Sequence, residues 1–321
     1  MEVLPDFALL RPETIDDLID ARARHPNARL LAGGTDLIPN MRRGLIDTDT
    51  VIDITACAEL ARIEPDGDGL GVGAAVTLAV LAENETVRRD WRALTDAAGA
   101  VAGPTQRAMA TVGGNICLDT RCIFYNQSEW WRRANDYCLK YRGEVCHVAP
   151  TSKRCLATYS GDLAAALLVY DATVEIAGPN GRRRIGLDEL LVDDGMDYIT
   201  LAGDEVLLSV HLPARFKGLA ARYEKIRVRG AIDFPLAGVA VGLRRDGDAI
   251  TELRIGLTGT NSNPLLIEIS SEGALDAVEA MVRKRVSPAR TGLIAPQYRR
   301  RAVAALAARM ARDLAGGFAT S

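Results

Sequence analysis

The distribution of cysteine constrains this chain more than any other feature of its sequence. Five of its six cysteines lie between positions 117 and 155, and no cysteine follows up to residue 321. The stretch from Asp119 to Thr158 carries four of them and shows neither the period of an amphipathic helix nor that of a strand. Regular patterns precede and follow this stretch. We therefore expect a regular fold into which one irregular segment, residues 119–158, is inserted.

The spacing of these cysteines does not name their chemistry. Cys122, Cys138, Cys146 and Cys155 leave 15, 7 and 8 residues between successive thiols. This pattern lacks the paired C-x-x-C of zinc sites and the tight run of ferredoxins. In a reducing compartment, thiols are free or metal-bound more often than they are paired as disulfides. A metal site and simple buried packing both remain open on spacing alone.

The rest of the chain alternates short helices and strands in an α+β pattern. The first two thirds predict a helix after Thr14, strands at 29–32, 51–54, 60–63, 69–73, 173–177, 183–185 and 206–212, and helices at 77–85, 91–101 and 161–168. Beyond a linker at 213–218, the pattern predicts strands at 220–228, 237–244 and 250–258 and helices at 274–285 and 298–314. We place domain boundaries so that residues 1–55 and 56–215 form two parts of one domain and residues 216–321 form another.

Composition and charge exclude several classes of function. The 321 residues are 48% hydrophobic and 25% charged, which suits a globular chain of two or three domains. A formal net charge of −3 argues against a nucleic-acid partner. The longest apolar run, residues 163–170, is far shorter than the roughly 20 residues that cross a bilayer, so we expect no membrane span. The N-terminal residues lack the order of a secretory signal, which predicts a cytoplasmic protein.

Two glycine pairs carry the clearest chemical signal. One lies in Ala32-Gly33-Gly34-Thr35-Asp36-Leu37 and the other in Thr111-Val112-Gly113-Gly114-Asn115. Adjacent glycines let successive backbone N–H groups converge on an anion such as a pyrophosphate, although each pair alone also suits a tight turn. Residues 71–76 lack the third glycine of the Rossmann fingerprint, so we expect no NAD site of that type.

Besides the two glycine loops, the sequence contains a helix start at Gly161-Asp162-Leu163, and Lys225 followed by Arg229 and Asp233. Together these features resemble the FAD-binding subunits of the molybdenum hydroxylases, the family of xanthine dehydrogenase and carbon monoxide dehydrogenase. The resemblance covers essentially the whole chain. It implies a vanillyl-alcohol-oxidase-type FAD-binding domain with subdomains at 1–55 and 56–215, and a C-terminal α+β domain at 216–321. The residues that it implies for FAD are Leu30, Leu31, Ala32, Gly33, Gly34, Thr35, Asp36, Leu37, Thr111, Val112, Gly113, Gly114, Asn115, Asp162 and Lys225.

The cysteine segment departs from the usual pattern of this family, in which a short connection joins the second loop to the helix at Asp162. Within the family, the insertion is similar to that of the β subunits of 4-hydroxybenzoyl-CoA reductases. This resemblance implies that Cys122, Cys138, Cys146 and Cys155 ligate a [4Fe-4S] cluster. Cys57 and Cys117 are then expected to be packing residues.

The same resemblance implies a role in electron transfer. Electrons from a ferredoxin would pass through the cluster and FAD to [2Fe-2S] clusters in a small partner subunit and to molybdenum in a large one. The enzyme would remove the phenolic hydroxyl of 4-hydroxybenzoyl-CoA, yielding benzoyl-CoA. No residue of this chain is expected to act as a catalytic acid, base or nucleophile.

Two other hypotheses remain. One is an oxidative molybdenum hydroxylase in which FAD passes electrons outward to NAD or a quinone. The other is a non-redox scaffold in which the four cysteines hold structural zinc.

Overall fold

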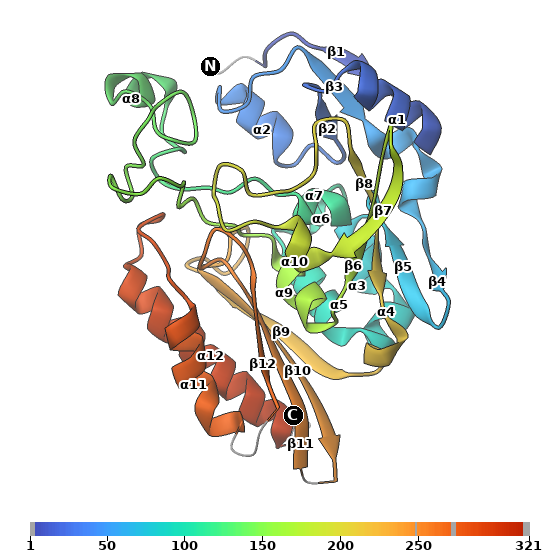
Figure 1. The fold of residues 1–321 in the computed structure, drawn as a ribbon, viewed down its shortest axis with the longest axis vertical. Coiled ribbons are helices and arrows are strands. Elements are labelled where there is room, and N and C mark those ends of the chain that lie inside the picture. The colour runs from blue at the N-terminus through green and yellow to red at the C-terminus, as the bar shows by residue number, and fades with distance from the viewer. Residues whose placement is uncertain (1–3, 248, 271–273, 317–321) are drawn as a thin grey trace.

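Three β-sheets, following one another along the chain, organise the fold (Figure 1). The computed structural model describes residues 4–247, 249–270 and 274–316, so the first three residues of the segment considered for a targeting signal lie outside it. None of the described helices combines the length and the apolar character that a membrane span requires.

The first sheet is parallel, with strand order β1-β3-β2. Its elements are β1 (Ala8–Leu10), α1 (Ile15–Arg24), β2 (Arg29–Leu31), α2 (Leu37–Arg42) and β3 (Thr50–Asp53). Thr14 caps α1, because its side chain accepts a hydrogen bond from the Asp17 N–H at 3.1 Å. The prediction of a strand at 60–63 is wrong. Two short 3-10 helices, η1 (Ile54–Ala56) and η2 (Ala58–Ala61), precede a strand that begins at Ile63. The reason is that Leu60, in η2, is buried in the small core beneath this sheet.

The second sheet has the order β4-β5-β8-β6-β7 and is antiparallel. Its strands are β4 (Ile63–Asp66), β5 (Gly69–Gly73), β6 (Thr173–Gly178), β7 (Gly181–Gly186) and β8 (Val206–Leu212). The helices that accompany it are α3 (Leu78–Glu83), α4 (Glu85–Asp90), α5 (Arg92–Ala100), α6 (Pro104–Arg107), α7 (Val112–Ile116), α9 (Asp162–Val169) and α10 (Leu187–Leu190).

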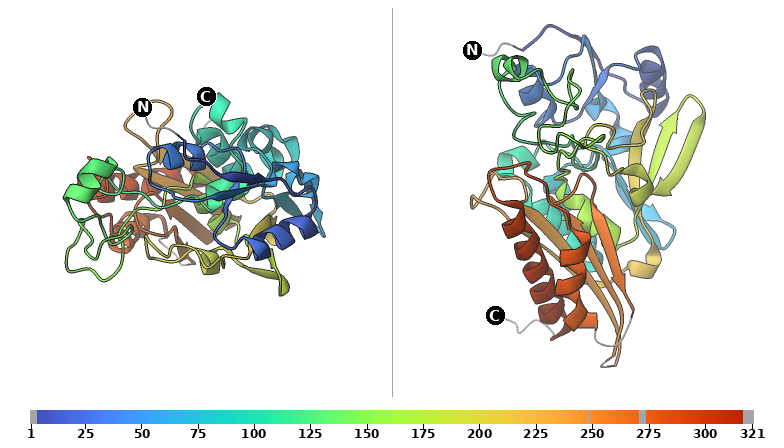
Figure 2. Two further views of the ribbon diagram at one scale, coloured as in Figure 1. Left: turned by 90° about the horizontal axis from the view of Figure 1, so that it is seen from above. Right: turned by 60° about the vertical axis from the view of Figure 1, so that its left-hand side comes forward.

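The third sheet is antiparallel, with the order β12-β11-β10-β9. Its elements are η3 (Ala214–Phe216), β9 (Ala220–Ile226), β10 (Ala237–Asp246), β11 (Ala249–Thr258), β12 (Leu265–Ile269), α11 (Ala274–Arg285) and α12 (Pro296–Ala315). The sequence pattern did not predict β12. Helices α11 and α12 cover one face of this sheet, as the two views in Figure 2 show, and form a core with it.

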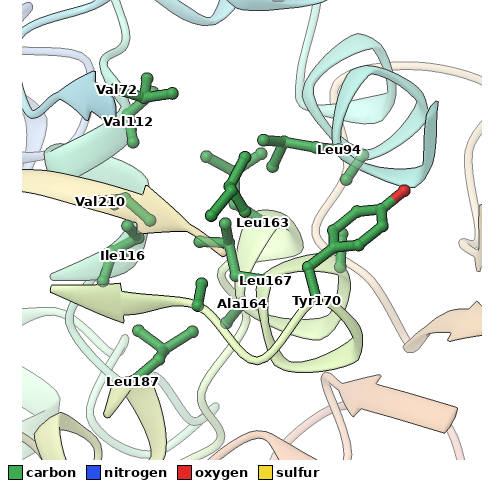
Figure 3. Packing of buried hydrophobic residues seen from close by; sticks show 14 of the residues in the cluster. Val72, Leu94, Val112, Ile116, Leu163, Ala164, Leu167, Tyr170, Leu187 and Val210 are labelled. Carbon is green, nitrogen blue, oxygen red and sulfur yellow. The ribbon is translucent and has the colours of Figure 1, made fainter. Parts of the chain in front are cut away.

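Helix α9 lies at the centre of the molecule, since all eight of its residues are buried and all but Asp162 are apolar. Leu163 and Leu167 pack against Leu94 and Val210 in the main core (Figure 3). The third sheet rests on the same helix: a Cβ added at Gly256 of β11 would lie 1.9 Å from the Ala165 carbonyl oxygen. The second and third sheets therefore share α9.

The cysteine segment, residues 119–158, forms the arm around α8 (Glu129–Ala134) that extends from the body in Figure 1. Its base is closed where Arg121 and Thr158 exchange two backbone hydrogen bonds of 2.9 Å. It also contacts the loop before α12, since the Ile123 N–H donates to the Thr291 carbonyl at 2.9 Å. The segment is thus closed at Arg121 and Thr158, and it contains α8, a regular element that the prediction omitted.

Candidate functional site

A cavity of about 1000 Å³ lies where the first sheet, the second sheet and the cysteine segment meet. Twelve of the fifteen residues predicted to contact FAD line it: Leu30, Ala32, Gly33, Gly34, Thr35, Asp36, Leu37, Thr111, Gly113, Gly114, Asn115 and Asp162. Leu31, Val112 and Lys225 do not. Val112 is 2% exposed and points into the main core near Val72 (Figure 3). The fold therefore brings the two glycine loops, whose first glycines are 80 positions apart in the sequence, to one cavity.

The two glycine loops touch, and glycine is required where they do so. A Cβ added at Gly33 would lie 1.8 Å from the carbonyl oxygen of Met109, just before the second loop. Gly34 has φ +69°, a left-handed conformation that side-chain-bearing residues rarely adopt. The first loop can therefore hold its shape only with glycine at both positions.

The second loop is a short helix, α7, where the sequence predicted only a loop. Its N-cap is Thr111, whose hydroxyl accepts a hydrogen bond from the Gly114 N–H at 3.2 Å. Asn115 has a structural task as well, because its Oδ1 accepts the Leu163 N–H at 3.0 Å and so satisfies a donor at the start of α9. The two polar side chains of this loop thus hold backbone in place at the cavity wall.

Lys225 is buried beside Asp162 and lies outside the cavity lining. Its Nζ lies 3.2 Å from Asp162 Oδ1, and the two side chains are 3% and 4% exposed. Tyr223 donates a hydrogen bond of 2.5 Å to the same carboxylate. Burial raises the pKa of Asp162, and the neighbouring Lys225 ammonium opposes that shift. The two residues form one buried charged unit, of which Asp162 reaches the cavity.

The loop after β9 completes the cavity wall. Asp233 Oδ2 accepts the backbone N–H groups of Val228 and Arg229, both at 3.1 Å, and this turn carries Arg229, Ile232 and Phe234 into the lining. The Asp233 carbonyl also accepts a hydrogen bond from Lys225 at 3.2 Å. The buried Asp162–Lys225 unit therefore supports this loop from behind.

The four cysteines of the inserted segment are all buried, with exposures of 4–7%. The Cys122 thiol lies within electrostatic range of Cys138 and Cys146, and the Cys155 thiol within range of Cys122 and Cys146. Cys122, Cys138 and Cys155 also share one apolar cluster with Tyr125. Burial raises the pKa of Cys122, and it raises that of Cys155 to about 12. The four thiols thus converge although 33 residues separate the first from the last.

Backbone N–H groups point at two of these sulfurs. The Tyr125 N–H donates to Cys122 Sγ and the Ala157 N–H donates to Cys155 Sγ, each at 3.4 Å. Within the described ranges, no group of three or more His, Cys, Asp or Glu side chains is arranged to hold a metal ion. Cys57 and Cys117 lie elsewhere: Cys57 is in the core beneath the first sheet, and Cys117 packs at the main core and lines the cavity.

Buried polar atoms without a partner concentrate in the inserted segment. Among the described residues there are seven such side-chain atoms, and four belong to this segment: Arg121 Nη1, Asn126 Oδ1, Arg132 Nε and Arg132 Nη1. Arg132 is 2% exposed in its side chain, and its Nη2 donates to the Gly44 carbonyl at 2.8 Å. Buried donors without acceptors are costly, so these guanidinium groups fit a site that receives an anionic group.

The aromatic side chains near the cysteines differ in exposure and in packing. His147 lies against Phe124 and Trp131 and hydrogen-bonds through Nε2 to the Tyr137 carbonyl, so its ring has a structural role. Trp130 is 79% exposed and does not shield the cysteine site. Trp131 packs on Phe124 and remains a local core residue.

A layer of side chains that the sequence did not single out separates the cavity from the cysteines. Tyr125 lines the cavity and belongs to the cysteine cluster, and its hydroxyl donates to the Leu45 carbonyl at 3.0 Å. Asn40 joins the two regions, because it donates to Asp36 of the first glycine loop at 2.9 Å and accepts from Arg121 of the segment. Burial raises the pKa of Asp36, and the Arg121 charge opposes this shift. No sequence motif indicates these residues, since they come together only in the folded chain.

Comparison with known proteins assigns the family. Residues 5–215 match the model of the FAD binding domain in molybdopterin dehydrogenase. The chain is also similar to the aldehyde oxidoreductase FAD-binding subunit PaoB of Escherichia coli K12, with 33% identity over 283 residues that cover 84% of this chain and 87% of the relative. The chain belongs to the FAD-binding subunits of the molybdenum hydroxylase family. In this flavin subunit, the matched residues contain both glycine loops and most of the cavity lining.

Further relatives are similar to this flavin subunit over nearly its full length. The xanthine dehydrogenase FAD-binding subunit of E. coli O157:H7 is 28% identical over 306 residues, covering 92% of this chain and 91% of the relative. In the structure of reconstituted CO dehydrogenase from Oligotropha carboxidovorans, one chain superposes with a TM-score of 0.79 at 21% identity, covering 98% of this chain and 99% of that one. The last similarity shows a shared fold.

Proposed function

We propose that this flavin subunit is the electron-transfer subunit of a 4-hydroxybenzoyl-CoA reductase, with FAD in the cavity and a [4Fe-4S] cluster on Cys122, Cys138, Cys146 and Cys155. The observation that carries the proposal is the convergence of four buried thiols in a segment whose own residue Tyr125 also lines the FAD cavity. A cysteine site in contact with the flavin cavity suits one electron path through both.

The groups around the thiols suit an anionic cluster. Within the described residues no three such ligands are grouped for a metal ion, so the proposal rests on the burial of the four thiols in one segment and on the charges near them. Four thiolates are the usual ligands of a [4Fe-4S] cluster. The two N–H···S hydrogen bonds and the unpaired guanidinium donors of Arg121 and Arg132 suit its negative charge.

The residues of the cavity are proposed to bind and orient FAD, and none is proposed to exchange protons with a substrate. The backbones of Gly33, Gly34, Gly113 and Gly114 line the cavity and are proposed to lie against the pyrophosphate. Asp162, held by Lys225 and Tyr223, presents a fixed acceptor at the wall. When bound, FAD supplies the chemistry that combines single electrons into pairs.

The overall reaction of the proposed enzyme balances as 4-hydroxybenzoyl-CoA plus two electrons and two protons, giving benzoyl-CoA and water. A ferredoxin would supply the electrons one at a time to the cluster. A small subunit with [2Fe-2S] clusters and a large subunit with the molybdenum cofactor would complete the path. Curated relatives are described as FAD-binding subunits or medium chains, which supports the assembly of this chain with other subunits.

A second candidate is favoured by the same relatives, which are described as xanthine dehydrogenase, aldehyde oxidoreductase and carbon monoxide dehydrogenase subunits. In an oxidative enzyme of that kind, electrons would leave FAD for NAD or a quinone. Such an enzyme needs no iron–sulfur cluster in this chain. Iron in the purified chain therefore favours the reductase, and a yellow, iron-free chain favours the oxidative candidate.

The decisive experiment is the iron, sulfide and flavin content of the chain purified without oxygen. We expect about four irons and one FAD per chain. Replacing any one of Cys122, Cys138, Cys146 or Cys155 with Ser should reduce the iron content and leave FAD bound, because a hydroxyl is a poor ligand for iron. Cys57→Ser and Cys117→Ser are the matched controls and should keep full iron. Full iron in an insertion variant, or its loss in a control, would refute the assignment.

The substrate assignment needs a separate measurement. The chain should co-purify with a large molybdenum subunit and a small [2Fe-2S] subunit when all three are produced together. With reduced ferredoxin as donor, this complex should convert 4-hydroxybenzoyl-CoA to benzoyl-CoA. A complex that carries the cluster but shows no such conversion would refute the substrate while leaving the cluster assignment intact.

A further inference from the structure

A second cavity, of about 640 Å³, opens at the surface between α11 and α12. Its lining consists of four cationic side chains and one amide: Arg283, Lys284, Arg300, Arg301 and Gln297. The first two belong to the last turn of α11, and the other three to the start of α12. Arg300 Nε donates to the Arg283 carbonyl at 2.6 Å, which joins the two helices at this point. We call the four cations of this lining the basic surface.

The part of the chain around the basic surface is rich in positive charge. Residues 280–312 contain nine Lys and Arg residues and no Asp or Glu, although the chain as a whole carries a net charge of −3. Farther along α12, Arg309 forms ion pairs with Glu224 at 2.6 Å and with Asp313 at 3.3 Å. Within the described residues, none of the four cations of the basic surface forms such an ion pair.

The two helices supply too little negative charge to offset these cations. Their acidic residues are Asp276, Glu279 and Asp313. Asp313 lies about three turns beyond the cavity, near the other end of α12, and pairs with Arg309. Glu279 and Asp276 precede Arg283 on α11 by about one and two turns. Two carboxylates beside the cavity cannot balance four cations in its lining, so the basic surface keeps a positive charge.

The basic surface lies beside the base of the cysteine segment. In the first turn of α12, Arg299 donates from Nη1 to Thr291 Oγ1 at 3.2 Å. The Thr291 hydroxyl also hydrogen-bonds to the Thr158 hydroxyl at 2.6 Å, and its carbonyl accepts the Ile123 N–H at 2.9 Å. One residue thus joins the start of α12 to both strands of the segment's base. A protein bound at the basic surface would therefore stand next to the cysteine segment.

We propose that the basic surface docks the acidic face of a ferredoxin-class electron donor. The inference rests on the proposed function, in which such a donor delivers electrons to the cysteine segment. Opposite charges steer a protein to its docking site and orient it there, and transient electron-transfer complexes use small interfaces. In the docked complex, one electron leaves the reduced donor and enters the cluster, and no bond forms or breaks.

The test reverses one exposed charge at a time, in Arg301→Glu and in Lys284→Glu. An acidic ferredoxin is titrated at low ionic strength onto the protein in the assembly in which it is isolated, and binding is followed by calorimetry. We expect about tenfold weaker binding to each variant. The unaltered protein should also lose affinity as salt is added, because salt screens the charges. Turnover with reduced methyl viologen, which needs no docking surface, should stay unchanged.

Two further variants separate the position of the charge from its amount. Arg245→Glu makes the same reversal at an exposed residue of β10 and should leave ferredoxin binding unchanged. This residue lies near the hairpin between β10 and β11, and Figure 1 shows that hairpin at the far end of the third sheet from the start of α12. Arg301→Lys keeps the positive charge and should bind the ferredoxin as the unaltered protein does.

The proposal is overturned if Arg301→Glu and Lys284→Glu bind the ferredoxin as tightly as Arg245→Glu does. Release of another subunit from the assembly by these variants would also overturn it, because the surface would then be a subunit interface. The same holds if a DNA oligonucleotide binds as tightly as the ferredoxin. A protein without iron whose ferredoxin binding responds to both reversals would reject the cluster and keep the docking surface. A protein with iron whose binding ignores them would do the opposite.

Discussion

The FAD cavity and the cysteine segment touch, but they are held together by different means. The glycine loops are fixed by backbone contacts, such as Gly33 against the Met109 carbonyl, and by helix caps. The cysteine segment adds side-chain contacts to its backbone hydrogen bonds, since Arg132 and Arg142 lie over the Tyr141 ring, and it contains buried guanidinium atoms that lack partners. We infer that the cavity is formed before FAD binds, whereas the segment gains stability from the group that its cysteines are proposed to hold.

The segment also carries more backbone strain than the loops. Asp136, Tyr137 and Arg142, which flank Cys138, have φ values of 56°, 59° and 59°. Residues with side chains adopt this region only at a cost that surrounding contacts must offset. In the first glycine loop, the left-handed position is Gly34, where the cost is small. The difference predicts that changes in the loops affect FAD and the whole fold, and that changes in the segment act locally.

The largest effect is expected from Gly33→Ala. The new Cβ would lie 1.8 Å from the Met109 carbonyl oxygen, so the two loops must separate. We expect loss of FAD and a fall of about 1–3 kcal/mol in the free energy of unfolding. Gly99→Ala is the control, since an added Cβ there meets nothing within 4 Å and alanine stabilises a helix by about 0.5–1 kcal/mol relative to glycine. Full flavin content in Gly33→Ala would contradict the rigid cavity.

A smaller and local effect is expected from Arg132→Met. The change removes the hydrogen bonds to Gly44 and Glu129, each 2.8 Å long, and the contact of the guanidinium with Tyr141. Hydrogen bonds of charged groups contribute about 1.5–3 kcal/mol. We expect faster proteolysis within residues 119–158, with the FAD content unchanged. Arg133→Met alters the same helix at a side chain that is 73% exposed, and should not accelerate cleavage. Cleavage spread over the whole chain would argue against a locally held segment.

Tyr125→Phe should have a weaker effect at the boundary of the two regions. It deletes the hydroxyl that donates to the Leu45 carbonyl at 3.0 Å and keeps the ring between cavity and cysteines. The expected loss is about 0.5–1.5 kcal/mol in the free energy of unfolding, measured by urea denaturation. Tyr141→Phe serves as the control, because its ring is a neighbour of Tyr125 and, in the part of the chain that the structure describes, its hydroxyl makes no hydrogen bond. Equal losses in both variants would remove the boundary role of Tyr125.

The smallest effect is expected from an ion pair that lies outside both the cavity and the cysteine segment. Arg183 donates to both carboxylate oxygens of Glu205 at 2.9 Å, and this contact lowers the pKa of Glu205. Because the pKa of Glu205 is lower in the folded state, the contact stabilises the fold at pH values above the unfolded-state pKa of about 4.3. This stabilisation is lost as the pH falls through the folded-state pKa. Glu205→Gln should therefore lose up to about 1 kcal/mol at pH 7, and the loss should shrink as the pH falls through the folded-state pKa. A loss that does not shrink as the pH is lowered would assign the difference to something other than charge.

Many elements could be predicted from the sequence because short-range rules control them. The helix predicted at 274–285 and the strand predicted at 206–212 have these bounds in the structure. Thr14 caps α1 as its position suggested. The strand β12 was missed because Leu265 to Ile269 is a short apolar run without alternation, and α7 was missed because two glycines disfavour a helix that its Thr111 cap and its packing nevertheless hold.

The candidate site divides in the same way. Sequence alone determined that two glycine pairs and four clustered cysteines exist, since these residue types are visible one at a time. Only the tertiary structure decided that the loops meet at Gly33 and Met109 and that Lys225 pairs with Asp162 beneath the cavity wall. These contacts join residues far apart along the chain. Their distances are set by the packing of the second and third sheets on α9 and of the first sheet on the second, which no local pattern encodes.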